Sequence, residues 1–208
     1  MDMTQETKPV ASPSGRLFVA LLVAFFTFPV VIVIALSATS WKPGSYANHG
    51  DLVQPPRPIR DAALRTVDDR VVRFGDFRNK WTLLYFGPAE CPSQCLQSLY
   101  KMRQVHLAVG KEMERVQRVF VATGTSGADG LAQRLKDYPG MTAMVGPAES
   151  ISALARQFTL PSDLPGAGPQ RIYLVDPLGN LVLSYPVDGD PRGMLKDLMR
   201  LLQYSWVG

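Results

Sequence analysis

The sequence is poor in the residues that most often carry thiol chemistry and metal binding. Only two cysteines, Cys91 and Cys95, and two histidines occur among its 208 residues. Any thiol chemistry or disulfide within the chain must therefore involve this one cysteine pair. Runs of Lys and Arg are also missing, so the formal charge of +4 indicates a solvated surface and not a nucleic-acid site. Internal repeats are absent too, and the length suits one globular domain plus an extra segment.

Charged residues are missing from one long apolar run, residues 17–38. As a helix this run would span about 33 Å, which matches a hydrocarbon core of about 30 Å. We predict an uncleaved transmembrane helix, kinked at Pro29. A cleaved secretory signal is the alternative, because Ala35-Leu36-Ser37 resembles a cleavage site. The apolar region of a signal is usually shorter, about 7 to 15 residues.

The predicted organisation has four parts: a cytoplasmic tail (1–16), the transmembrane helix (17–38), a linker (39–60) and a folded domain (61–208). Basic residues flank the apolar run on both sides, so their count hardly fixes the orientation. Arg16 directly adjoins the run, and large C-terminal domains are translocated regardless of charge. We therefore expect a single-pass protein of a bacterial inner membrane with a periplasmic C-terminal domain, a compartment that permits disulfide chemistry.

The cysteines follow a stretch that predicts a buried strand. Residues 81–86 are bulky and apolar, and Gly87-Pro88 ends the run. Pro92 suits the first turn of a helix, and apolar residues then recur at helical spacing until Gly110. The expected order is core strand, cysteine loop and helix.

This placement has a chemical consequence for Cys91 and Cys95. The N-terminal end of a helix favours thiolate over thiol, and the thiolate attacks disulfides and binds soft metals. Residues four apart share one side of a helix, so the two sulfurs can close a disulfide or hold one Cu(I). The pair is thus the candidate catalytic and metal site. A purely structural disulfide is the alternative, although so short a bridge constrains little of the unfolded chain.

The rest of the chain alternates between strand and helix patterns. We predict hairpins at 65–77 and 171–185, strands at 115–122 and 141–145, and helices at 129–138, 150–158 and 191–203. This order predicts an α/β fold with helices packed on a central mixed sheet.

Few other side chains are candidates for a metal site. His49 lies in the predicted linker, where it is either a solvated loop residue or a copper ligand that reaches the cysteines. His106 lies about 16 Å beyond Cys95 along the predicted helix, too far for a shared metal, so we expect a surface or packing role. Met102 is expected in the core, which is also the default for Met141 and Met144.

From about Asp61 onward the chain resembles the thioredoxin-like superfamily, and most closely its Sco/SenC family of membrane-anchored copper proteins that help to assemble cytochrome c oxidase. The matching residues are Phe86-Gly87, Cys91-Pro92, Cys95 and the segments 146–158 and 173–179. The resemblance implies a thioredoxin-like domain, copper bound at Cys91 and Cys95, and a cytochrome c oxidase subunit or another assembly factor as partner.

One departure from the family pattern changes the expected chemistry. The family's third copper ligand is a histidine, and its position here is Gly168. Two thiolates alone suit Cu(I) far better than Cu(II), and they can also reduce a partner's disulfide. Three functions follow as hypotheses: an oxidase assembly factor that handles Cu(I) or reduces the recipient's cysteines, a general periplasmic thiol-disulfide oxidoreductase, and a non-catalytic scaffold.

Overall fold

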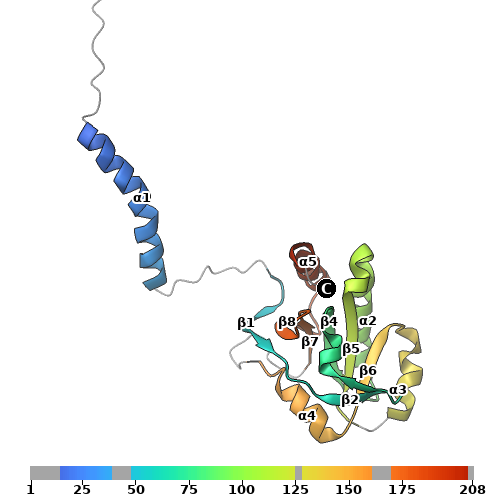
Figure 1. The fold of residues 1–208 in the computed structure, drawn as a ribbon. Helices are drawn as coiled ribbons and strands as arrows, with labels where there is room; N and C mark the ends of the chain where they lie inside the picture. The colour runs from blue at the N-terminus through green and yellow to red at the C-terminus, as the bar shows by residue number, and fades with distance from the viewer. Residues whose placement is uncertain (1–14, 39–47, 125–127, 161–169, 206–208) are drawn as a thin grey trace, which may run out of the picture. The chain divides into compact units, whose positions relative to one another are not determined.

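The computed structural model describes residues 15–38, 48–124, 128–160 and 170–205. The chain forms two compact units, Met1–Tyr46 and Ala47–Gly208. The described part of the first unit is the helix α1 (Gly15–Ala38), drawn in blue in Figure 1. By its length and composition α1 is able to cross a membrane. Pro29 lies inside it.

The second unit is built on one mixed sheet of eight strands. Their order is β1-β8-β7-β4-β5-β6-β2-β3. The pairs β4–β5 and β5–β6 are parallel, and the other neighbours are antiparallel. The strands are β1 (Asp51–Pro58), β2 (Ala63–Thr66), β3 (Val71–Arg73), β4 (Trp81–Gly87), β5 (Val116–Ala122), β6 (Met141–Val145), β7 (Arg171–Val175) and β8 (Asn180–Pro186).

Helices cover both faces of this sheet, so the unit has three layers (Figure 1). Alternate residues of the central strand β4 enter two separate apolar clusters, because successive side chains of a strand point to opposite faces. The first cluster lies against α2 (Ser93–Ala108), α3 (Ala128–Arg134) and α5 (Pro191–Tyr204). The second lies against α4 (Ala148–Arg156) and the 3-10 turn η1 (Phe74–Phe77). Every residue of β4 is buried, as its continuous apolar run predicts.

Most of the predicted elements are confirmed. The hairpin β2–β3 turns at Asp69, whose φ of 60° is the left-handed conformation that such turns use. The hairpin β7–β8 turns at Gly179, with φ of 90°. The helix predicted at 129–138 is shorter, because α3 ends at Arg134 and continues as the 3-10 turn η3 (Leu135–Asp137).

The prediction of a linker through residue 60 is wrong for its last part. Residues 51–58 form β1, an edge strand that pairs with β8, so the folded unit begins well before residue 61. The prolines at 55, 56 and 58 hide this strand from pattern analysis, yet an edge strand tolerates proline because its outer N–H groups need no partner. Buried Arg171 pairs with Asp51 and donates to Ser184 Oγ at 3.0 Å, which ties β1 to the hairpin.

Candidate functional site

The site lies where β4 ends and α2 begins. The backbone leaves β4 at Gly87, and the N–H of Cys91 donates to the carbonyl of Pro88 at 3.0 Å. Cys91 has φ of 39°, a left-handed conformation that turns the chain toward the helix. Pro92 is the N-cap residue of α2, and its carbonyl accepts from the N–H of Leu96 at 3.0 Å. A proline at the cap fits because no N–H is required there.

The structure brings the two cysteines together as a disulfide. Their Cα atoms are 5.0 Å apart, within the usual range for a disulfide. Cys95 lies in the first turn of α2, whereas Cys91 precedes the helix. The two sulfurs therefore meet across a turn and a helix start, and not along one helix face as the spacing alone would place them.

Both sulfurs belong to the core below the surface. Cys91 and Cys95 are each 2% exposed. A Cβ atom built on Gly87 would lie 2.9 Å from the ring of Tyr85, 3.0 Å from that of Phe120 and 3.3 Å from Cys95 Sγ. Only glycine fits at this position, because the rings and the sulfur leave no space for a side chain. An exchange partner can reach the disulfide only after the residues that cover it have moved.

The pair lies beside the N-terminal end of α2. Pro92, the N-cap residue, offers no side-chain acceptor to the first N–H groups of α2. These groups and the helix dipole stabilise negative charge on a nearby sulfur. The neighbouring Tyr85 stays a neutral phenol, because burial raises its pKa more than the hydrogen bond with Ser98 lowers it.

The donor set among the described residues fits Cu(I) as a cargo and supplies no third ligand for a resident Cu(II) centre. Among the described residues, no three His, Cys, Asp or Glu side chains lie close enough together to hold a metal. Once reduced, the pair supplies two soft thiolates, which Cu(I) accepts at low coordination number. The family's histidine position, Gly168, lies outside the described residues.

Neither histidine is free to complete the cysteine site. His106 Nε2 lies 3.0 Å from the carbonyl oxygen of Val116, so His106 packs against the start of β5, as expected. Its pKa is lowered, first by burial and then by the charge of Arg118. His49 Nδ1 instead lies 3.0 Å from Asp197 Oδ1, so the imidazole is held against α5.

The methionines considered in the sequence analysis lie in or near the core. Met102 and Met144 are fully buried, and Met141 is half-buried.

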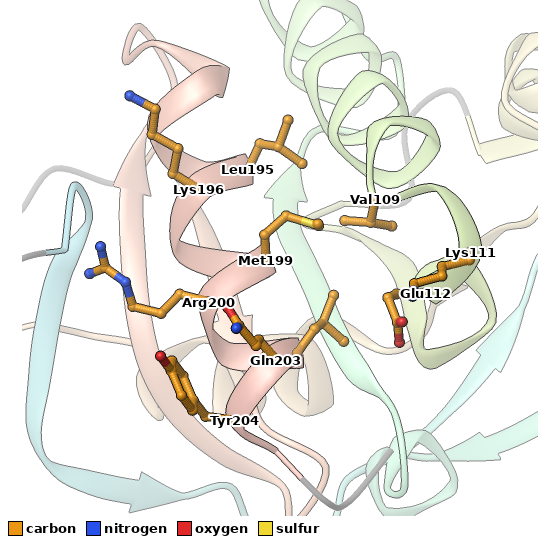
Figure 2. A pocket seen from close by; sticks show the side chains of 10 residues that line it. Val109, Lys111, Glu112, Leu195, Lys196, Met199, Arg200, Gln203 and Tyr204 are labelled. Carbon is orange, nitrogen blue, oxygen red and sulfur yellow. The ribbon is translucent and has the colours of Figure 1, made fainter.

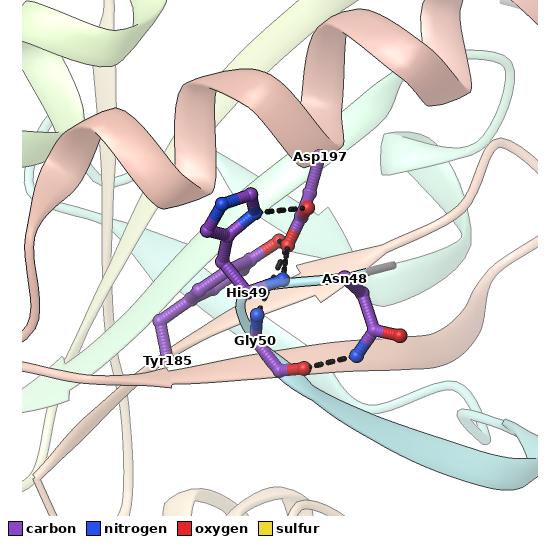
Figure 3. Close-up of polar contacts among 5 residues, drawn as sticks. All are labelled: Asn48, His49, Gly50, Tyr185 and Asp197. Atoms are coloured by element: carbon purple, nitrogen blue, oxygen red, sulfur yellow. Dashed lines mark hydrogen bonds and ion pairs between the residues drawn. The ribbon is translucent and has the colours of Figure 1, made fainter. Parts of the chain in front are cut away.

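A second polar cluster, which the sequence analysis missed, surrounds the carboxylate of Asp197 (Figure 3). Asp197 is buried, and its Oδ2 accepts from the backbone N–H groups of His49 at 2.7 Å and Gly50 at 3.0 Å, and from the hydroxyl of Tyr185 at 3.2 Å. Burial and this carboxylate raise the pKa of Tyr185 far above its usual value. The sequence does contain one signal for this cluster, because Asp197 lies on the otherwise apolar face of the predicted helix 191–203.

The glycine at position 193 lets this cluster form. A Cβ atom added to Gly193 would lie 2.7 Å from His49 Cβ, so a side chain there would push the segment before β1 away from α5. The cluster thereby fastens the N-terminal edge of the folded unit to its C-terminal helix. Its groups are satisfied by one another, which indicates a structural role.

The comparisons with known proteins bear on the family and the fold. A protein of Stutzerimonas stutzeri, whose name suggests copper binding, is 25% identical over 82% of this chain and 88% of its own length. The mitochondrial SCO2 homologue of Bos taurus is 31% identical, and the match covers 49% of this chain and only 40% of that relative. The solution structure of apo Sco1 from Thermus thermophilus is 26% identical, with a TM-score of 0.58 over 77% of this chain and 98% of that protein.

These relatives confirm the expected resemblance to Sco proteins and the thioredoxin-like fold. The family described as the transmembrane-like, thioredoxin-like C-terminal domain matches residues 81–205, which include β4, both cysteines and every later described element. The chain therefore belongs to this thioredoxin-like family, with Sco proteins among its relatives and structural neighbours.

Proposed function

We propose that this protein is a membrane-anchored assembly factor for the copper centre of cytochrome c oxidase, and that its Cys91–Cys95 pair acts in the reduced form. The observation that carries the proposal is the pair itself, two cysteines within bonding distance at the start of a helix that follows a core strand. The Sco relatives and the copper-related name of the Stutzerimonas stutzeri protein support the assignment to copper handling.

In the first mode the reduced pair carries Cu(I). Reduction of the disulfide yields two thiolates on Cα atoms 5.0 Å apart, a separation that lets both sulfurs face one ion. Two soft ligands satisfy Cu(I) and leave it open to attack by further ligands. A recipient cysteine or histidine then supplies the next ligand, and the ion is passed on by ligand exchange.

In the second mode the reduced pair prepares the recipient's cysteines. One thiolate attacks a sulfur of the recipient's disulfide, and the recipient's other sulfur leaves as a thiolate. The second cysteine then attacks the mixed disulfide, which releases the recipient's remaining thiolate and forms the Cys91–Cys95 disulfide. Two electrons pass to the recipient, and a dithiol donor outside the chain restores the reduced pair.

The helix α1 supplies the anchor in this proposal. It holds the folded unit on the periplasmic side of a bacterial inner membrane. This arrangement rests on the apolar length of α1 and on Arg16 next to the apolar run.

The deciding experiment compares wild type with Cys91→Ser/Cys95→Ser in a strain that lacks the gene. We expect the double variant to fold but to leave oxidase activity and oxidase copper content at the level of the deletion. In parallel, the purified reduced protein is titrated with Cu(I) against a competing chelator. Stoichiometric binding that the double variant lacks identifies the carrier mode. Failure to bind, with rapid reduction of a recipient-derived disulfide peptide, identifies the reductant mode.

One observation favours a second candidate, a scaffold that binds an oxidase subunit or another assembly protein without thiol chemistry. Both cysteine residues are only 2% exposed, which is typical of a structural disulfide. Full restoration of oxidase activity by the double serine variant would overturn both modes of the dithiol and would favour this scaffold.

A further inference from the structure

The exposed surface of α5 carries positive charge and no negative charge. Its exposed residues are Arg192, Lys196, Met199, Arg200, Gln203 and Tyr204. The three basic residues are four apart in the sequence, so they form one stripe along the helix. Asp197, the one acidic residue of α5, is buried and engaged with His49, Gly50 and Tyr185. The helix is thus polar and cationic on its outer side.

Large apolar side chains lie beside this stripe. Met199 is 43% exposed, Tyr204 is 73% exposed, and Leu178 in the β7–β8 turn is 66% exposed. They border two adjoining grooves of about 680 and 420 Å³, which share Arg200 and Tyr204. Figure 2 shows Lys196, Arg200 and Tyr204 on one side of α5, with Met199 directed toward Val109. We call these six residues the α5 face: Leu178, Arg192, Lys196, Met199, Arg200 and Tyr204.

The acidic groups that line the same grooves are already engaged. Glu112 pairs with Arg115 at 2.9 Å. Asp176 Oδ1 accepts the backbone N–H groups of Leu178 at 2.9 Å and Asn180 at 2.8 Å, and its Oδ2 accepts from the Asn180 side chain. Lys111 adds a further positive charge at the first groove. Basic side chains thus outnumber acidic ones in the lining of the two grooves, and this excess of positive charge favours an anionic occupant.

With α1 as the membrane anchor of the proposed function, the length of the connecting chain limits how far the α5 face can lie from the membrane. His49 lies eleven residues after Ala38, the last residue of α1, so the connecting chain spans at most about 40 Å when fully extended. His49 and Gly50 are hydrogen-bonded to Asp197, which lies in the middle of α5. The described chain thus enters the folded unit at His49 and Gly50, which are held against α5.

We propose that the α5 face docks on the anionic phospholipid surface of the membrane that anchors the chain. A face on which basic side chains lie beside Met, Leu and Tyr matches a bilayer interface. The charged ends of its basic side chains contact lipid phosphates, and its apolar side chains enter the boundary with the acyl chains. Docking on lipid fixes the orientation of the folded unit, and it is independent of the oxidation state of the cysteines.

The test uses the full chain in lipid nanodiscs and measures amide hydrogen exchange. In discs with about 30% anionic lipid we expect the amides at the C-terminal end of α5 and in the β7–β8 turn to exchange roughly tenfold more slowly than in purely zwitterionic discs. High salt should remove most of this difference, because it screens exposed charges. The double variant Lys196→Glu/Arg200→Glu should lose it.

The matched control is Arg65→Glu/Arg70→Glu, which makes the same change of charge in the β2–β3 hairpin, at the opposite edge of the sheet. This control should keep the protection. Equal exchange in both kinds of disc would overturn the proposal. So would protection that appears only after oxidase subunits are added, which would make the face a protein interface. Exchange in β4 and β5 shows whether each variant is folded.

Discussion

At the scale of single residues, Asp197 has the greatest consequence for the fold. Its buried carboxylate accepts two backbone N–H groups and a phenol, and it pairs with an imidazole. Removal of the carboxylate would leave these donors without their acceptor inside the protein. A buried donor without a partner costs more free energy than the hydrogen bond contributed.

We therefore expect Asp197→Ala to lower the free energy of unfolding by about 3 kcal/mol. Tyr185→Phe is the matched control, because it removes only one donor and should cost about 1 kcal/mol. Urea denaturation followed by circular dichroism measures both values. Equal costs for the two variants would contradict the central role of the carboxylate.

His106 makes the stability depend on pH. Burial and the charge of Arg118 lower the pKa of His106, so the folded state binds its proton less readily than the unfolded chain, whose histidine pKa is about 6.5. The stability is unaffected above that pH and falls as the pH drops from about 6.5 through the lowered pKa. In His106→Gln the loss of stability between about pH 7 and pH 5 should be smaller. Unfolding midpoints at the two pH values test this, and identical losses in the two proteins would refute it.

At the scale of elements, the turn between β4 and α2 depends on Gly87. Its missing side chain leaves room for Cys95 Sγ and for the rings of Tyr85 and Phe120, which are almost completely buried and have little freedom to move. The same close packing holds both sulfurs below the surface. Stability and access to the cysteines are thus determined together at this position.

We expect Gly87→Ala to cost about 2 kcal/mol of stability through overpacking. The displaced turn should also expose the disulfide, so that a soluble dithiol reduces it faster than in wild type. Thermal unfolding and the rate of reduction measure the two effects. Gly124→Ala is a suitable control, because a Cβ there has no neighbour within 4 Å. A wild-type reduction rate in the Gly87 variant would show that packing at this turn does not limit access.

The elements that the sequence predicts well are those with a local pattern. The apolar run of β4, the helical spacing of α2 and α5, and the turn residues of both hairpins lie within short windows, and they appear in the structure as expected. The strand β1 has no such pattern, because prolines interrupt it and its partner β8 is distant in the sequence. Only tertiary pairing makes it a strand.

The candidate site likewise has one part that the local sequence predicts and another part that depends on tertiary packing. The proximity of Cys91 and Cys95 follows from their spacing, but their burial depends on β4, β5 and α2 packing together. The contact between His49 and Asp197 joins residues 148 apart, and nothing local predicts it. Pattern analysis therefore finds the chemistry of the cysteine pair but not the cluster that holds the edge of the domain.

At the scale of the whole molecule, the proposed function gives α1 the role of a membrane anchor. We expect the full chain to stay in the membrane fraction after an alkaline carbonate wash, because the 24 residues of α1 are long enough to span the hydrocarbon core. Deletion of residues 1–38 should release the protein. Protease added to spheroplasts should digest the folded unit and leave an N-terminal tag intact. A mature N-terminus found just after Ser37 would instead show that the segment is a cleaved signal.

The pairing of β1 with β8 also sets the order in which a growing chain can fold. Asp51 pairs with Ser184, 133 residues further along the chain. At synthesis rates of roughly 5 to 20 residues per second, β8 emerges on the order of ten seconds after β1. During that interval β1 has no partner, whereas β4, β5 and β6 can already pair with one another. The β1 edge of the sheet is therefore the last to close, so a newly made chain presents an open sheet edge to chaperones until its C-terminal hairpin has arrived.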